Sequence, residues 1–245
     1  MSDVPGTLQT GSSLQLLNCH RGEATTNSAI QRFSKNETCF GFFLQEPWAS
    51  KGKNPPEHPD FFQFTPTSFN NKCATYIRRS ALLQPTVHTK HSNHVIAVTI
   101  HPPHQAPITL YNIYSPGLAI HAARFFENHT PQLPCIIMGD LNAHHSWWYG
   151  SESTNTSQIA NTIRSSTAIV DWKDKNNFSL QNTPGVYTHF PSNGNQPSII
   201  DLCFTSGLNA STVLVWGIDP DSASDHAICY IHLNFTIAKP ILKRN

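Results

Sequence analysis

The stretch 139–148, GDLNAHHSWW, directly follows the apolar run PCIIM (134–138), a run that is typical of a buried strand. Polar and charged side chains appear as soon as this run ends, and two tryptophans come after them. A surface loop needs polar residues but no pair of tryptophans, whereas a core accepts tryptophan but not an unpaired carboxylate. The stretch therefore indicates a binding site at the edge of a sheet, where the chain leaves the core and polar and aromatic side chains stand side by side.

The same pattern recurs at four other apolar runs, where polar side chains stand at or near the strand ends: Asn18 after LQLL, Glu46 after FGFFLQ, Asp201 within SIIDLCF, and Asp225 with His226 before AICYI. Most of these residues, taken singly, also have an ordinary structural explanation. Each could be a turn residue, a solvated strand end or a surface histidine. Asp201 differs, because apolar neighbours on both sides predict its burial, and a buried carboxylate is costly unless it is paired. His226 is the best candidate for the partner.

The bulk composition limits the class of protein. The chain has 245 residues, a charged fraction of 13% and a formal net charge of +1. This length suits one large α/β domain, and the charge lacks the basic excess of a strong nonspecific nucleic-acid binder. Any contact with DNA or RNA should therefore be local or helped by another module. Six cysteines without CxxC spacing argue against a zinc site and favour reduced, buried thiols.

Local patterns predict about ten strands and three helices, and hence an α/β domain around two packed sheets. We expect a loop over 50–72, which is rich in Pro, Asn and Lys. The predicted helices cover 23–34, 117–129 and 157–174. The predicted strands cover 14–20, 38–48, 73–80, 94–101, 108–115, 134–140, 178–182, 186–190, 198–206, 211–219 and 226–235.

The organisation along the chain predicts a single domain over 14–238, with a flexible lead-in at 1–13 and a tail at 239–245. No window holds 18 apolar residues, so we expect no membrane span. The N-terminus has neither the basic start nor the apolar core of a signal peptide, so we expect an intracellular protein.

Six short motifs in order along the chain carry a resemblance to a known family: LNCHRG (17–22), LQEPW (44–48), YNIYSP (111–116), GDLNAHH (139–145), SIIDLCF (198–204) and SDHAI (224–228). With them the chain resembles the endonuclease/exonuclease/phosphatase superfamily, which has the fold of DNase I and the apurinic/apyrimidinic endonucleases. The stretches GDLNAHHSWWYG and LQNTPGVYTHFPSNGNQPSIIDLCFTS look most like the apurinic/apyrimidinic-endonuclease-like domain of non-LTR retrotransposons of the fungal and arthropod type. The resemblance implies a four-layer α/β/β/α sandwich, whose strand ends converge on one cleft.

The resemblance also implies a metal centre and a general base. Glu46 would be the main ligand of Mg²⁺, with Mn²⁺ as the alternative ion, because carboxylates with retained waters suit such ions. Asn18 and Asp225 would lie close to the ion. Asp140 would accept the proton of the attacking water or hold that water in line, and Asn142 would orient Asp140 or donate to the phosphate.

Further roles concern the phosphate. By resemblance, His226 would donate to a non-bridging phosphate oxygen, and Asp201 would fix its ring and favour its charged form. Tyr114 matches the active-site tyrosine of the family. His144 and His145 belong to the retrotransposon version of the motif, where a structural role fits better than metal ligation. Trp147 and Trp148 would pack the loop back onto the domain.

The DNA-facing positions depart from the repair enzymes. Thr188 matches a position that contacts the DNA backbone, whereas Ser198 stands where the repair enzymes place an aromatic residue in the abasic-sugar pocket. Gly117 replaces an Asn that they carry after the active-site tyrosine. Both changes argue against abasic-site specificity. The segment PSNGNQP (191–197) predicts a hairpin loop, whose Asn193, Asn195 and Gln196 can bond base edges or sense groove width.

Together these features predict a Mg²⁺-dependent DNA endonuclease that hydrolyses phosphodiester bonds. Its nick would leave a 3′-OH that primes reverse transcription of a non-LTR retrotransposon. The expected partners are double-stranded DNA and a reverse-transcriptase domain of the same element, and the expected location is the nucleus. The chain itself carries no reverse-transcriptase signature, so it would be an excised domain, a truncated copy or a standalone product. The alternatives are a DNase I-like enzyme acting on another phosphoester and a non-catalytic domesticated copy.

Overall fold

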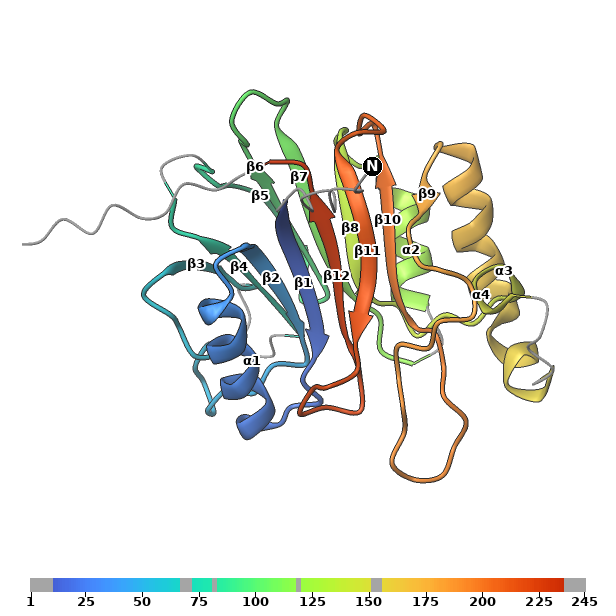
Figure 1. Ribbon diagram of the computed structural model, residues 1–245. Coiled ribbons are helices and arrows are strands. Elements are labelled where there is room, and N and C mark those ends of the chain that lie inside the picture. Colours follow the sequence, from blue (N-terminus) through green and yellow to red (C-terminus); the bar gives the residue numbers. More distant parts are fainter. Residues whose placement is uncertain (1–10, 67–71, 81–82, 118–119, 151–155, 236–245) are drawn as a thin grey trace, which may run out of the picture.

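Two β-sheets face each other and carry helices on their outer sides in the computed structural model (Figure 1). The structure describes residues 11–66, 72–80, 83–117, 120–150 and 156–235. Helix α1 (Glu23–Lys35) covers the first sheet, and α2 (Ile120–Asn128) and α4 (Thr156–Lys175) cover the second. No helix in these ranges combines the length and the apolar character that crossing a membrane requires.

Each sheet contains six strands among the described residues. The first sheet has the order β11 (Val213–Asp219), β12 (Ile228–Leu233), β1 (Ser12–Asn18), β2 (Cys39–Gln45), β4 (Cys73–Arg78) and β3 (Phe61–Phe64). The second sheet has the order β5 (Thr86–Ser92), β6 (Val95–Ile100), β7 (Ile108–Tyr114), β8 (Cys135–Asp140), β10 (Asp201–Ser206) and β9 (Ser179–Leu180).

Three apolar layers hold the sandwich together. In β2, Phe43 belongs to the layer between the sheets, whereas its neighbour Phe42 packs in the layer beneath α1. This alternation follows from the period of two along a strand and explains why β2 is apolar throughout. Phe126 of α2 lies in the third layer, outside the second sheet. The predicted four-layer α/β/β/α sandwich is confirmed.

Several boundaries differ from the predictions. The 50–72 segment, expected to be loop, contains β3, and a strand at β5 was not predicted. The segment 186–190 is not a strand, because only His189 makes isolated bridges there, to Ser198 and His226. Strand β1 begins at Ser12, two residues before the predicted start of the domain at residue 14. Residues 1–10 of the predicted lead-in and the predicted tail at 239–245 lie outside the described residues.

The strand registers bring the polar strand ends to one edge of the sandwich. Asn18 pairs with Gln45 at the carboxyl ends of the parallel strands β1 and β2. In the second sheet Tyr114 pairs with Asp140, and Asp140 pairs with Asp201 at the start of the antiparallel strand β10. Because β7 and β8 are parallel and β10 runs the other way, these three residues form one row across three adjacent strands.

Candidate active site

Asp140 lies at the centre of the site and is 2% exposed. Its Oδ2 accepts a hydrogen bond from Asn18 Nδ2 at 2.8 Å, and its Oδ1 accepts one from the backbone N–H of Asn142 at 3.0 Å. Burial, together with the charge of Asp201, raises the pKa of Asp140 to about 7, although His226 and these two hydrogen bonds act in the opposite direction. The carboxyl group therefore exchanges its proton near neutral pH.

His226 and Asp201 form a buried pair beside Asp140. His226 Nδ1 lies 2.9 Å from Asp201 Oδ2, and the two residues are 5% and 1% exposed. Burial opposes the imidazolium, but the Asp201 charge and hydrogen bond outweigh it and raise the pKa of His226 to about 9. Asp201 Oδ1 has no hydrogen-bond partner within the described ranges. The Asp201 charge therefore depends on His226 for its compensation.

The turn after β8 is built around Asn142. Its backbone has a φ of 46°, in the left-handed region where Asn is one of the few tolerated residues. This conformation lets its N–H return to Asp140, while its Nδ2 donates to the carbonyl of Ser115 at 2.9 Å. Asn142 thus joins the ends of β7 and β8 and holds one oxygen of the Asp140 carboxylate through a hydrogen bond.

Glu46 stands just beyond the end of β2, with a φ of 41°. Its Oε1 lies 3.1 Å from Arg21 Nε and 3.8 Å from Lys72 Nζ, and the side chain is 15% exposed. Burial, then the charges of Glu46 and Asp140 and a hydrogen bond with Glu46, raise the pKa of Tyr114 well above its usual range. Tyr114 therefore keeps its hydroxyl proton at neutral pH.

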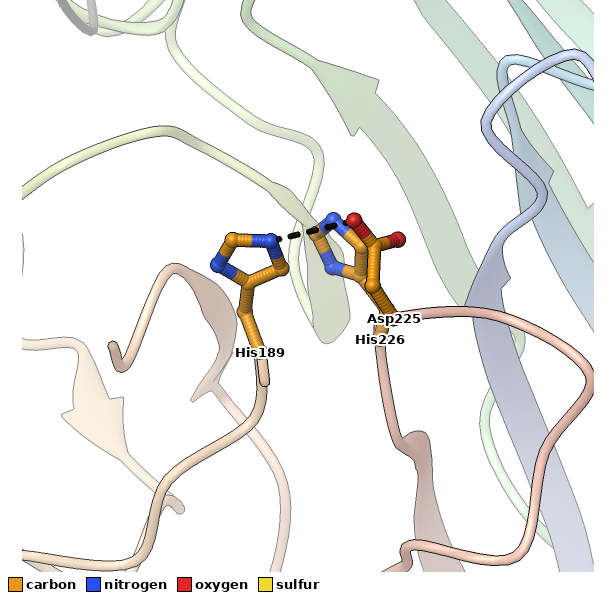
Figure 2. Close-up of side chains that lie close together, drawn as sticks. All are labelled: His189, Asp225 and His226. Carbon is orange, nitrogen blue, oxygen red and sulfur yellow. Dashed lines mark ion pairs between the residues drawn. The ribbon is translucent and has the colours of Figure 1, made fainter. Parts of the chain in front are cut away.

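Two histidines that were not predicted from the sequence as site residues lie next to Asp225. Asp225 Oδ2 lies 3.5 Å from His20 Nδ1. The same oxygen lies 3.4 Å from His189 Nε2, which Figure 2 shows beside His226. Burial alone would raise the pKa of Asp225, but His226, His189 and His20 together lower it. Burial and the nearby charge of His226 lower the pKa of His189. No local sequence signal marks His189, because only the fold brings it to Asp225.

The histidine–tryptophan loop after β8 is structural. Trp148 is completely buried, and the Lys173 ammonium lies 4.0 Å from the centre of the Trp147 ring, which is 46% exposed. His145 Nδ1 accepts the N–H of Trp147 and caps the short helix α3 (Ser146–Tyr149). His144 Nδ1 lies 2.8 Å from the Tyr149 hydroxyl. These contacts agree with the structural role predicted for both histidines and for Trp148.

Comparison with known families decides what kind of protein this site belongs to. Residues 108–230, half of the chain, match the family model described as Endonuclease-reverse transcriptase. The chain belongs to this family. No curated protein matches the chain. The matched residues include the row of Tyr114, Asp140 and Asp201 and also His226, whereas Asn18 and Glu46 lie outside the match.

Solved structures share the fold of this family member. The endonuclease domain of TRAS1, a telomere-specific non-LTR retrotransposon, aligns with a TM-score of 0.69 at 18% identity, over 91% of this chain and 99% of that one. The AP endonuclease LMAP from Leishmania major aligns with a TM-score of 0.69 at 15% identity, over 95% and 92%. The 3′-5′ exonuclease NExo from Neisseria meningitidis aligns with a TM-score of 0.65 at 12% identity, over 91% and 100%. The predicted DNase I-like superfamily and its fold are confirmed.

Two residues predicted to contact DNA are buried in this family member. Thr188 is 0% exposed, and its Oγ1 accepts the N–H groups of Ile200 and Asp201 at 3.2 and 3.1 Å. Ser198 is 7% exposed, and its Oγ lies 3.0 Å from His189 Nδ1. Both side chains therefore position other site residues instead of facing the solvent.

The remaining predicted DNA contacts lie on the loop that leaves the body of the molecule between His189 and Ser198. Asn193 and Asn195 are exposed on this loop, and Asn193 Oδ1 accepts the N–H of Asn195 at 3.2 Å. Backbone hydrogen bonds between His189 and Ser198 close its base, and Figure 1 shows it extending beyond the sheets. The loop thus starts beside Asp225 and the catalytic candidates.

Proposed function

We propose that the chain is a Mg²⁺-dependent DNA endonuclease that hydrolyses phosphodiester bonds in double-stranded DNA. The observation that carries the proposal is the buried cluster of Asp140, Asp201 and His226, in which one carboxyl group and one imidazole have displaced pKa values. Such displacement is common at catalytic sites. The cluster offers a base and a protonated donor within one small volume, which hydrolysis of a phosphodiester requires.

The residues expected to hold a metal ion have the right donor atoms for Mg²⁺. Mg²⁺ binds oxygen ligands, retains several waters and needs only one or two protein carboxylates. Glu46 supplies a carboxylate that is 15% exposed, and Asn18 Oδ1 accepts only the N–H of His20 among the described contacts, so a lone pair remains. Asp225 supplies a second carboxylate. A bound Mg²⁺ would contribute positive charge toward the phosphate oxygens, and Mn²⁺ has the same preference for oxygen.

Asp140 is suited to accept a proton from the attacking water. With a pKa of about 7 it is ionised in a large fraction of molecules at neutral pH, yet it is basic enough to take the proton. Asn18 and the backbone of Asn142 fix its two oxygens. These bonds limit rotation of the carboxylate, so its remaining lone pairs keep one direction.

His226 is suited to stabilise charge on the phosphate. It remains protonated at neutral pH, because its pKa is about 9. Its Nδ1–H donates to Asp201, and its Nε2–H is then available for a non-bridging phosphate oxygen. The neutral Tyr114 hydroxyl supplies a further donor at the neighbouring strand end.

We further propose that the nick leaves a 3′-OH that primes reverse transcription for a non-LTR retroelement, in the nucleus. This role draws support from the name of the matched family and from the shared fold of the TRAS1 endonuclease domain. A reverse-transcriptase domain of the same element would then be the functional partner.

Supercoiled plasmid provides the test. The purified protein should convert it to the nicked form only with Mg²⁺ or Mn²⁺ present, and DNA polymerase should extend the nick, which shows a 3′-OH. Glu46→Ala should abolish this conversion. Glu57→Ala, which removes an exposed carboxylate before β3, should leave it unchanged. An intact plasmid at every ion concentration, with release of phosphate from another phosphoester, would instead favour a phosphatase.

A further inference from the structure

The loop between β11 and β12, which carries Asp225, is fastened to helix α1. Thr25 Oγ1 donates to the carbonyl of Ala223 at 2.9 Å. The Arg32 guanidinium donates to the carbonyl of Asp221. Both donors belong to α1, on the outer side of the first sheet, and both acceptors come before Asp225 in the chain. The helix therefore holds the start of the loop, whereas the side chain of Asp225 needs further contacts.

Ser224 supplies these contacts, because it lies between the anchored part of the loop and the site. Its Oγ lies 2.7 Å from the carbonyl oxygen of Asn18 and 3.2 Å from Asp225 Oδ1. The backbone N–H of His226 donates to the same Oγ at 3.2 Å. A serine hydroxyl has one proton to donate and two lone pairs that accept. The two oxygens therefore share that proton in a three-centre hydrogen bond.

The Ser224 hydroxyl links two strand ends that the first sheet itself does not hold together. Asn18 is the last residue of β1, and Asp225 comes before β12. These two strands are neighbours, but their pairing stops at Leu16 and Cys229. Strand pairing therefore reaches neither Asn18 nor Asp225, and the hydroxyl joins them beyond the end of the ladder.

The Asp225 carboxylate depends on this hydroxyl at one of its two oxygens. Its Oδ2 faces His20 Nδ1 and His189 Nε2 at 3.5 and 3.4 Å, both longer than the usual 2.7–3.2 Å or so of a direct N–H···O hydrogen bond. Its Oδ1 has the Ser224 hydroxyl as its one hydrogen-bond partner among the described contacts. Without that hydroxyl, the two histidines alone would set the direction of the carboxylate.

We propose that Ser224 is a positioning residue, whose hydroxyl holds Asp225 and the Asn18 end of β1 in the arrangement that binds Mg²⁺. The inference rests on the proposed function, in which Asn18 and Asp225 lie close to the ion. In this role Ser224 touches neither the ion nor the phosphate. Outer hydrogen bonds of this kind orient the ligands of a metal, and their loss weakens metal affinity or activity by about 10–100-fold.

Direct binding of Mn²⁺ tests the inference, because binding needs no activity. Electron paramagnetic resonance measures how much Mn²⁺ remains unbound in the presence of the protein. Ser224→Ala should weaken Mn²⁺ binding about 10-fold or more, and Ser224→Thr, which keeps a hydroxyl on the same carbon, should restore most of the affinity. Ser34→Ala is the matched control, because Ser34 Oγ donates to the carbonyl of Gln31 within α1, at 2.9 Å, and should leave Mn²⁺ affinity unchanged.

The dependence of nicking on Mg²⁺ gives a second measurement. A positioning role predicts that Ser224→Ala raises the Mg²⁺ concentration needed for half-maximal nicking and changes the rate at saturating Mg²⁺ less. A general loss of structure would instead lower the saturated rate and the melting temperature measured without metal. We expect the fold to be kept, because the anchors at Thr25 and Arg32 do not involve Ser224. Ser224→Cys, with nearly the same size and only a weak donor, should also bind Mn²⁺ weakly and covers the case in which Ser224→Ala does not fold.

The outcomes separate this inference from the proposed function. Equal Mn²⁺ affinity in the wild type and in the folded alanine or cysteine variant would overturn the positioning role, and so would equal losses in Ser224→Ala and Ser224→Thr. A wild type that binds no Mn²⁺ would overturn it together with the metal site. Mn²⁺ binding that depends on the Ser224 hydroxyl, in a protein that does not nick plasmid, would support the positioning role and overturn the proposed function alone.

Discussion

Asp140→Asn gives the sharpest test of the electrostatics of the site. The folded protein raises the pKa of Asp140 from 3.8 to about 7, chiefly through burial. The folded state therefore binds this proton more tightly than the unfolded chain. Stability must fall as the pH rises from about 4 toward about 7, because the unfolded state then releases the proton first. Asparagine carries no such proton and removes this dependence.

The magnitude follows from the shift. Within the window between the two pKa values, each pH unit changes the free energy of unfolding by about 1.4 kcal/mol. Between about pH 4 and about pH 6.5 the free energy of unfolding of Asp140→Asn, relative to the wild type, should rise by about 3 kcal/mol. Stopping near pH 6.5 keeps His226 charged in the folded state, since its pKa there is about 9.

Urea unfolding at several pH values measures the difference. The asparagine must place its NH₂ against Asn18 or against the N–H of Asn142, but that cost does not depend on pH. Asp60→Asn, at a side chain that is 55% exposed, should give a much flatter difference. A difference between wild type and Asp140→Asn that stays constant from pH 4 to pH 6.5 would refute the burial argument. The same variant should lose roughly 10²–10⁴ in nicking rate.

Three further outcomes are expected from the proposed function. The nicking rate should rise with pH through about 7, as Asp140 loses its proton, and fall above about 9, as His226 loses its proton. A nicking rate that stays constant over that pH range would contradict these roles. His226→Ala should lower the rate by roughly 10²–10⁴, and combining it with Asp140→Ala should cost less than the product of the single losses, whereas strict multiplication would indicate independent roles. Replacing 192–196 by a short Gly-Ser turn should preserve nicking but change the positions of the nicks. Sequencing of the nick positions on a long duplex measures this change. Identical positions for both proteins would show that the loop has no role in the choice of nick site.

The sequence predicted the part of the site that lies on buried strands. Asp140, Asp201 and His226 adjoin apolar runs whose burial is evident, so a polar residue there needs a partner. The structure brings these three together with Asn18, as the strand ends imply. Glu46 lies beside Tyr114, and its role as a metal ligand stays a prediction.

The features that could not be predicted from the sequence depend on contacts between segments that are distant along the chain. His189 looked like one residue of an ordinary strand, and only folding places it 3.4 Å from Asp225. The segment around it, VYTHF (186–190), has β-branched and aromatic residues, yet Tyr187 and Phe190 are 42% and 40% exposed, and no ladder forms. Strand β3 was not predicted, because the Pro-rich composition of the surrounding segment indicated a loop. Its four residues, FFQF, nevertheless pair with β4.

The two sheets meet in the site through side-chain hydrogen bonds, and this has a consequence for immature copies of the protein. Asn18, from one sheet, bonds to Asp140 of the other, and His226, which leads into the first sheet, bonds to Asp201 of the second. Neither half of the sandwich holds a complete set of reacting groups. Under the proposed function, a chain that is newly made or partly unfolded would lack a complete site and would not nick DNA. The two sheets must first pack together, so incompletely folded copies would be harmless to the DNA of the cell that makes them.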